Sequence, residues 1–213
     1  MAPQKMLRNE ISKTKLMLVE GADAKFFCIW ALEAYEINDV QVMDFGGITE
    51  LYGYLKMLSV LPDYEKVKSI VIVRDAEGKP NTAVISIKKA LKENSLPVPA
   101  KPFEFTHNNP RVAFMLFPGF DGIRNLVPGT LEDLCVAIIK DADVKRLDCV
   151  TAYLSCLENE GKNITWRHKS FLHAYFSGEN RFVGMKIGEA SRAGAWNWEN
   201  EQLKPFKEIV KTM

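Results

Sequence analysis

The chain is organised around residues 68–78, KSIVIVRDAEG, where an apolar run stops abruptly at two acids. Residues 70–73 show no polar alternation and are β-branched, which is typical of a strand buried on both faces of a parallel sheet. Asp75 and Glu77 follow this run and would lie at the carboxyl edge of the sheet. Because open α/β sheets bind ligands outside that edge, the two acids mark a candidate site. The alternative is that the strand simply ends there at solvent.

The hydrophobic pattern on either side of this run predicts alternating strands and helices. Buried strands are expected at residues 15–20, 40–45 and 112–117, with a short edge strand at 103–106. Helical periodicity covers residues 22–37, 48–61, 81–94, 130–156 with an interruption at 141–143, 167–176 and 201–210. Three strand–helix units in succession imply right-handed crossovers. We therefore expect an α/β fold: a Rossmann-like, mostly parallel central sheet of about four strands flanked by helices, with a helical C-terminal extension.

The length of 213 residues is long for one average domain and short for two. We expect one compact unit, with an α/β core over residues 1–125 and a helical extension over residues 126–213 packed on it. No stretch approaches the length that spans a bilayer, and the N-terminus lacks an apolar signal region. The four cysteines form no C-x-x-C pair, so we expect at least three of them to be buried thiols. These features predict a cytoplasmic protein without membrane contact.

The formal net charge of +1 provides no global field for an anionic partner, so any such partner must meet a local patch. Residues 162–192 contain an excess of basic residues interleaved with aromatic ones, a composition that suits a groove for nucleic acid with stacking surfaces. The alternative is a solvated face whose aromatic residues are mostly core. The basic residues are Lys162, Arg167, Lys169, Arg181, Lys186 and Arg192, and the rings are Trp166, His168, His173, Tyr175, Phe176 and Phe182.

Further acids follow the other predicted strands. Glu20 ends the first strand, and Glu132 and Asp133 come after the fourth. Parallel strands would bring these acids to the same edge as Asp75 and Glu77, where they would repel one another without a cation. Carboxylate oxygens suit Mg²⁺ or Mn²⁺, which can activate water and stabilise charge on a phosphate. For any single acid, a strand end at solvent remains the alternative explanation.

These residues carry a resemblance to a known family. The segment LMLVEGADAKFF, followed by VIVRDAE, resembles the Toprim domain over about residues 14–120. That domain is the metal-binding core of topoisomerases, bacterial-type primases and the OLD and recombination-repair nucleases. The later segments PGTLEDL and IGEASRAGAW resemble a small stand-alone family of prokaryotic Toprim-like proteins with no assigned function, related to the OLD-type nucleases.

The resemblance implies roles for individual residues. Glu20 matches the glutamate that acts as metal ligand or general acid/base, and Lys169 the late lysine that stabilises transition-state charge. Asp75 and Glu77 match a pair of metal ligands, while Glu132, with Asp133 beside it, resembles the acid that supports a second metal. The implied catalytic residues are thus Glu20 and Lys169, and the implied ligands of Mg²⁺ (or Mn²⁺) are Glu20, Asp75, Glu77, Glu132 and Asp133.

The sequence departs from the family pattern at two places. Asp23 comes one residue early, and the usual aspartate of the second motif is replaced by Glu77. Two hypotheses therefore stand. The first is a Mg²⁺- or Mn²⁺-dependent nuclease for nucleic acid, in phage defence or repair, which would need a protein partner for any ATP-driven activity. The second is a catalytically degenerate binding or regulatory module. A nucleotide-processing enzyme that uses the same acids is a third, weaker hypothesis.

Overall fold

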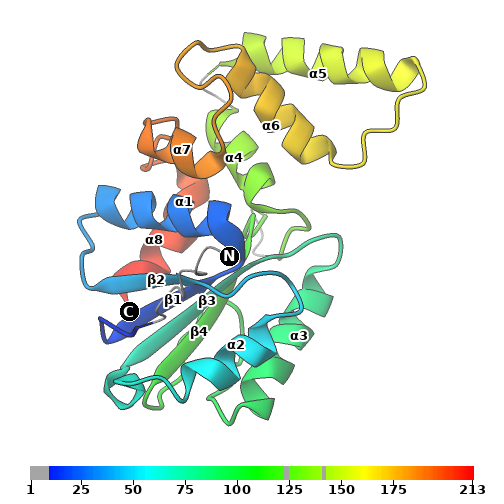
Figure 1. Cartoon of the computed structure of the whole chain (residues 1–213). Coiled ribbons are helices and arrows are strands. Elements are labelled where there is room, and N and C mark those ends of the chain that lie inside the picture. The colour runs from blue at the N-terminus through cyan, green and yellow to red at the C-terminus, as the bar shows by residue number, and fades with distance from the viewer. Residues whose placement is uncertain (1–9, 122–124, 141–142) are drawn as a thin grey trace, which may run out of the picture.

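The computed structural model describes residues 10–121, 125–140 and 143–213. Its strands and helices alternate as far as the fourth strand, at residues 111–117, and only helices follow it in the described part of the chain (Figure 1). In chain order the elements are β1 (Lys15–Val19), α1 (Gly21–Ala34), β2 (Val40–Asp44), α2 (Leu51–Leu58), η1 (Tyr64–Lys66), β3 (Ser69–Asp75), α3 (Pro80–Glu93), β4 (Arg111–Phe117), α4 (Leu131–Ile139), α5 (Val144–Asn159), α6 (Arg167–Ser177), α7 (Ile187–Arg192), η2 (Glu201–Leu203) and α8 (Lys204–Lys211), where η denotes a 3₁₀ helix.

The four strands form one parallel sheet in the order β2-β1-β3-β4. The predicted α/β fold with a parallel sheet and helices after it is therefore confirmed. In the register of this sheet, Val19 of β1 lies beside Val73 of β3, and Asp75 lies beside Phe117 of β4. The carboxyl ends of β1, β3 and β4 consequently meet at one edge.

Side-chain alternation divides the core into two layers, one on each face of the sheet. Val71 and Val73 pack into a cluster with residues of α1, α4, α6, α7 and α8. Ile70 and Ile72 pack into a second cluster with α2 and α3. The alternation continues to the strand end, so that Arg74 and Asp75 project to opposite faces.

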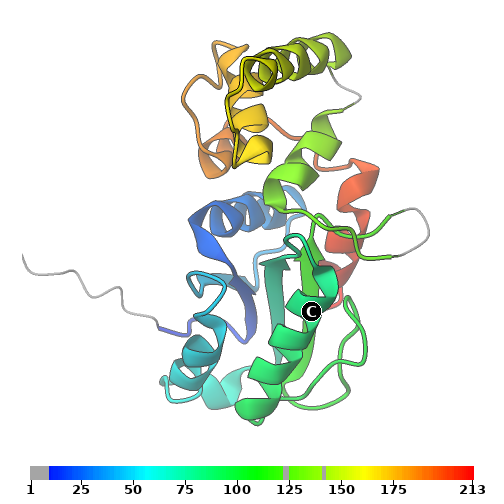
Figure 2. The same cartoon turned by 90° about the vertical axis from the view of Figure 1, so that its right-hand side faces the viewer.

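Helices α4 to α7 lie over the carboxyl edge of the sheet (Figures 1 and 2). Helix α8 then packs on the same face of the sheet as α1. Phe206 of α8 belongs to the same buried cluster as Phe27 of α1 and Phe117 of β4. Helix α7 crosses α1 at Gly188, where an added Cβ would lie 2.5 Å from Cβ of Phe26. Only glycine permits this close approach. One core thus joins the sheet to the C-terminal helices.

Several local predictions differ from the structure. Residues 103–106 form no strand, because Phe103 has a φ of 62°, although its N–H and that of Thr106 donate to carbonyls of β4. Helix α7 was not predicted. Of the interruption predicted at residues 141–143, positions 141–142 lie outside the described residues.

The prediction of at least three buried thiols is wrong. Cys149 and Cys156 are exposed on α5, which buries one face against α6, whereas Cys28 and Cys135 are buried. In the described part of the chain, no helix has both the length and the apolar character needed to cross a membrane.

Candidate carboxylate site

Asp75, at the end of β3, is tied to the start of α4. Its Oδ1 accepts a hydrogen bond from the N–H of Leu131 at 2.9 Å. The backbones of Glu77 and Gly129 are paired by two hydrogen bonds, each 2.8 Å long. These contacts clamp the exit of β3 against the segment before α4. They place Glu132, the second residue of α4, at the same edge as Asp75.

The first turn of α4 separates the roles of its two acids. Oδ2 of Asp133 accepts from the N–H of Thr130 at 2.8 Å and from its hydroxyl at 3.1 Å, so Asp133 caps the helix. Glu132 takes no part in the cap and is only 9% exposed. Asp133 thus caps α4, and Glu132 is the acid of this turn that remains available to act with Asp75.

Electrostatics confirm that the acids are close. Burial is the largest cause that raises the pKa of Asp75, the charges of Glu132, Glu20 and Glu77 raise it too, and the Leu131 N–H lowers it; together they bring this pKa to about 8. The thiol of Cys135, buried one turn into α4, also has a raised pKa, first through burial and then through the charge of Glu132. Several carboxyl groups therefore share a poorly solvated region.

Glu20 approaches the site from β1 but is engaged by an arginine. Its Oε2 lies 3.2 Å from Nε of Arg74, and the guanidinium also donates from Nη1 to the hydroxyl of Ser86 at 3.1 Å. Burial raises the pKa of Glu20, and the charge of Arg74 opposes that rise. Arg74 is 5% exposed, and its Nε is not aligned for a hydrogen bond to Glu20. Sequence reasoning missed this residue, although an arginine inside an apolar strand was a signal for it.

Lys169, far along the chain, reaches the same group of acids. Its Nζ lies 3.7 Å from Oε1 of Glu132 and 5.6 Å from the ring centroid of Trp166. Helix α6 therefore places the ammonium group of Lys169 next to Glu132, which α4 positions at the same edge as Asp75. Glu77, in contrast, is exposed and has a left-handed φ of 55°. It contributes charge to the group but lies at its rim.

Two other acids near the strand ends hold the backbone. Oδ1 of Asp44 accepts from the N–H groups of Gly21 at 2.9 Å and Gly46 at 2.8 Å, which ties the exits of β1 and β2 together. Oδ1 of Asp23 is 3.5 Å from the N–H of Gly188 in α7. Both carboxylates therefore have architectural contacts.

The donors at the edge fit Mg²⁺ or Mn²⁺ in kind, because carboxylate oxygens are what these ions prefer. One oxygen of Asp75 is used by Leu131, which leaves the other for a cation. Among the described residues, however, no three His, Cys, Asp or Glu side chains already converge closely enough to hold a metal ion. Binding would therefore require side-chain rotation, most obviously of Glu20 away from Arg74.

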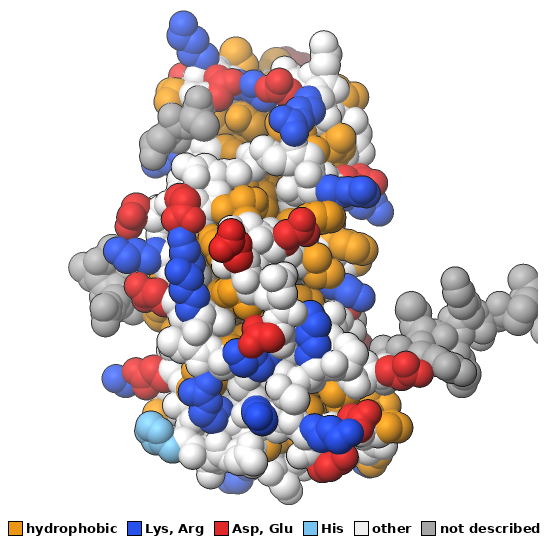
Figure 3. All heavy atoms as spheres, turned by 90° about the vertical axis from the view of Figure 1, so that its left-hand side faces the viewer, with side chains coloured by type: hydrophobic (Ala, Val, Ile, Leu, Met, Phe, Trp, Pro, Cys, Tyr) orange, Lys and Arg blue, Asp and Glu red, His pale blue; other side chains and the backbone are white. Residues whose placement is uncertain are grey.

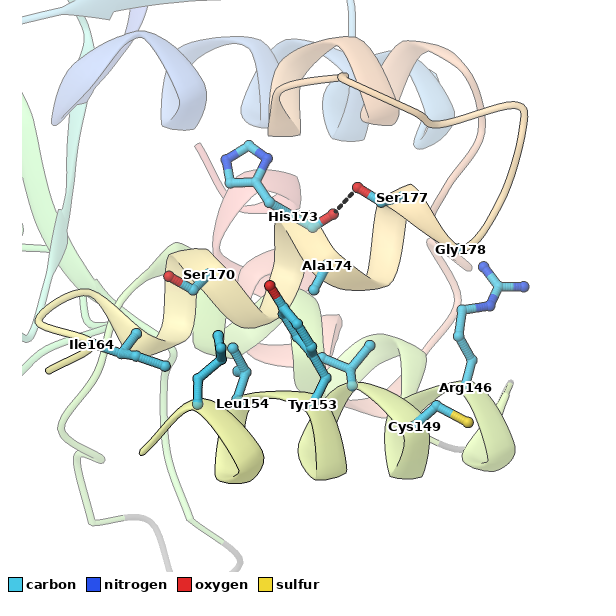
Figure 4. Close-up of a pocket in the computed structure, with 12 residues that line it drawn as sticks. Arg146, Cys149, Tyr153, Leu154, Ile164, Ser170, His173, Ala174, Ser177 and Gly178 are labelled. Carbon is cyan, nitrogen blue, oxygen red and sulfur yellow. Dashed lines mark hydrogen bonds between the residues drawn. The ribbon is translucent and has the colours of Figure 1, made fainter. Parts of the chain in front are cut away.

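A cavity lies away from these acids, in the C-terminal helices. A groove of about 630 Å³ lies between α5 and α6, lined mainly by apolar side chains such as Leu154 and Ile164, with Tyr153 reaching across it (Figure 4). In the same view the ring of His173 points away from α5. None of the predicted metal-binding or catalytic residues lines this groove, although His173 of the predicted nucleic-acid segment does.

Three of the basic residues of 162–192 already have neighbours in the structure. Arg167 pairs with Glu158 at 2.9 Å, while Arg181 and Arg192 lie over aromatic rings. Figure 3 shows basic and acidic side chains interspersed on the face where α7 and β2 lie, with no field of one sign. Within this segment, Lys169 is the residue shown beside the acids of the edge.

The fold and the site together define an α/β protein with several acidic side chains gathered at the carboxyl edge of a parallel sheet. A family model described as "Protein of unknown function (DUF3226)" matches residues 14–213. The chain belongs to the DUF3226 family. The expectation of a family without assigned function is thereby confirmed, and membership of the Toprim superfamily remains a prediction. No curated protein matches the chain significantly.

Solved structures of the C-terminal region of the Xanthomonas campestris pv. campestris OLD protein are similar to the chain. The form phased with mercury has a TM-score of 0.47 at 12% identity and covers 95% of this chain and 96% of that one. The form phased with platinum has a TM-score of 0.45 at 13% identity, with coverage of 94% and 93%. At these values the likeness carries no argument about function.

Proposed function

We propose that the chain is a Toprim-like protein that binds Mg²⁺ or Mn²⁺ at the carboxyl edge of its sheet and hydrolyses phosphodiester bonds of nucleic acid. The observation that carries this proposal is the meeting of Lys169 with Glu132, 3.7 Å apart, next to the residue whose N–H binds Asp75. Acids that would hold a cation and a lysine that would meet a phosphate thus come together from separate elements.

The roles follow from position and burial. Asp75 and Glu132 would hold the ion, with Glu20 and Glu77 as further ligands from β1 and from the β3 exit. The ion would supply water activation and charge neutralisation. Lys169 is half-exposed, so its ammonium can contact a phosphate oxygen and stabilise developing charge. Glu20, once released from Arg74, is the carboxylate available to accept a proton.

A second candidate function is a binding or regulatory module that has lost catalysis. The ion pair between Glu20 and Arg74 favours this second function, because a Glu20 carboxylate that is paired with Arg74 is not available to bind a metal or accept a proton. The rim position of Glu77 points the same way. Such a module would keep the fold and bind metal weakly.

One assay separates the two functions. Purified protein is incubated with labelled single- and double-stranded DNA and RNA in Mg²⁺, Mn²⁺ or EDTA. The nuclease requires cleavage that depends on metal and is lost in Glu20→Gln, Asp75→Asn and Lys169→Gln. Asp39→Asn is the matched control, because that acid pairs with Lys15 on the surface. Absence of cleavage, together with Mn²⁺ affinity weaker than millimolar by calorimetry, would establish the degenerate module.

A further inference from the structure

Trp166 presents its indole ring to solvent immediately before α6. The side chain is 60% exposed, whereas Trp196 is buried in the core and Trp30 and Trp198 are half-buried. Tryptophan is usually largely buried in folded proteins, and an exposed ring offers a flat apolar face to a partner.

One side chain, Lys169, links the Trp166 ring to the carboxylate site. Nζ of Lys169 is 5.6 Å from the Trp166 centroid and 3.7 Å from Oε1 of Glu132. The imidazole of His168 meets the indole edge-on, with centroids 6.2 Å apart. A planar group stacked on Trp166 would therefore have Lys169 next to it and the acids of the sheet edge beyond.

The surrounding charges favour a narrow contact over a long phosphate track. Arg167, next to Trp166, is held by Glu158, and Arg146 in α5 is held by Asp143 and Glu179. Recognition here would depend on the Trp166 ring and on Lys169, whose side chain is 54% exposed. The faces of bases are open to stacking in single strands and hidden inside a duplex.

We propose that Trp166 is a base-stacking platform that, with Lys169, positions a single strand of nucleic acid at the carboxylate edge. This inference rests on the proposed function for its substrate class. It names the form of the substrate, single-stranded, and the residue that selects it. Trp166 is thus a positioning residue, which acts through the placement of the strand.

The test measures binding apart from cleavage. Fluorescence anisotropy of a labelled twelve-nucleotide single strand, and of the same sequence as a duplex, is recorded in EDTA for the full chain. Trp166→Ala should weaken single-strand binding about tenfold, within the range for loss of one stacked base. Trp166→Phe should restore most of it. Duplex binding should be weaker and unaffected by either variant.

Two controls make the result specific. Tyr52→Ala removes another exposed ring, 45% exposed on α2, and should leave binding unchanged. Lys169→Gln should reduce the salt dependence of single-strand binding, whereas Trp166→Ala should not, because stacking releases no counterions. A Trp166→Ala protein that binds within twofold of wild type would overturn the proposal, as would failure of Trp166→Phe to restore binding or failure of the wild type to bind any single strand.

The outcomes distinguish this inference from the nuclease. If the wild type cleaves nucleic acid and Trp166→Ala binds and cleaves as well as the wild type, the nuclease is supported and the stacking platform is wrong. Binding that is lost in Trp166→Ala, in a protein that never cleaves, supports the platform and removes the nuclease. If the variant instead dissolves a protein dimer in sedimentation and does not affect oligonucleotide binding, the ring serves a protein interface and the proposal is wrong.

Discussion

Nε of Arg74 lies 3.2 Å from Oε2 of Glu20, and both side chains are largely buried at the edge of the sheet. Removing one member of a buried ion pair leaves the other charge poorly solvated, at a cost of about 3–5 kcal/mol. Arg74→Gln should therefore lower the free energy of unfolding by about 3 kcal/mol in urea titrations at pH 7. The double variant Glu20→Gln/Arg74→Gln should lose less than Arg74→Gln alone. Lys89→Gln, which breaks an exposed pair with Glu93, should have no effect. Equal stability of Arg74→Gln and wild type would contradict the prediction.

The raised pKa of Asp75 predicts a pH-dependent stability in metal-free protein. Burial and the neighbouring acids hold this pKa at about 8 in the folded chain, against about 3.9 in the unfolded chain. Between these values the folded chain keeps a proton that the unfolded chain has released, so stability falls as pH rises from about 4 to about 8. Below this window both states are protonated, and above it both are ionised. Glu20, whose pKa is also raised, contributes in the same direction.

The measurement is urea unfolding in EDTA at several pH values from 5 to 8. The slope attributable to Asp75 cannot exceed about 1.4 kcal/mol per pH unit. Asp75→Asn should flatten the profile, and saturating Mn²⁺ should reduce the loss at pH 8. Parallel profiles for Asp75→Asn and wild type would show that this carboxyl is ionised throughout.

Gly129 is expected to be required for the geometry of the site. Its φ is 138°, and an added Cβ would lie 2.8 Å from Oδ2 of Asp133. Gly129→Ala should therefore disturb both the helix cap and the pairing with Glu77, and lower stability by about 1–3 kcal/mol. Gly78→Ala is the matched control, because a Cβ at Gly78 meets nothing within 4 Å. Thermal unfolding that ranks the two variants equally would contradict this reading.

The two neighbouring acids of α4 should separate in metal binding. Asp133→Ala removes a cap and should cost about 1 kcal/mol of stability while changing Mn²⁺ affinity less than threefold. Glu132→Gln should weaken Mn²⁺ binding about tenfold or more. Calorimetric titration of both variants checks this. If Asp133→Ala weakens Mn²⁺ binding as strongly as Glu132→Gln, Asp133 is a ligand as the sequence predicted.

Local patterns predicted the architecture well because burial on both faces leaves a plain signal. The apolar run at Val71 and Ile72 is typical of an inner strand, and Asp75 was correctly expected at its exit. The same logic did not reveal α7, a helix of six residues that packs closely against α1 at Gly188. It also placed a strand at residues 103–106, where the backbone of Phe103 turns away.

What the sequence alone determined is a parallel α/β sheet with acids at its carboxyl edge, since the strand–helix alternation implies parallel strands, whose carboxyl ends lie at one edge of the sheet. Tertiary structure decided which acids share an environment. In the folded chain Lys169 lies next to Glu132, Asp133 caps α4, and Glu20 forms an ion pair with Arg74. These outcomes depend on how distant elements pack and which partner each carboxylate finds within a few ångströms, and that information lies in no local pattern of residues.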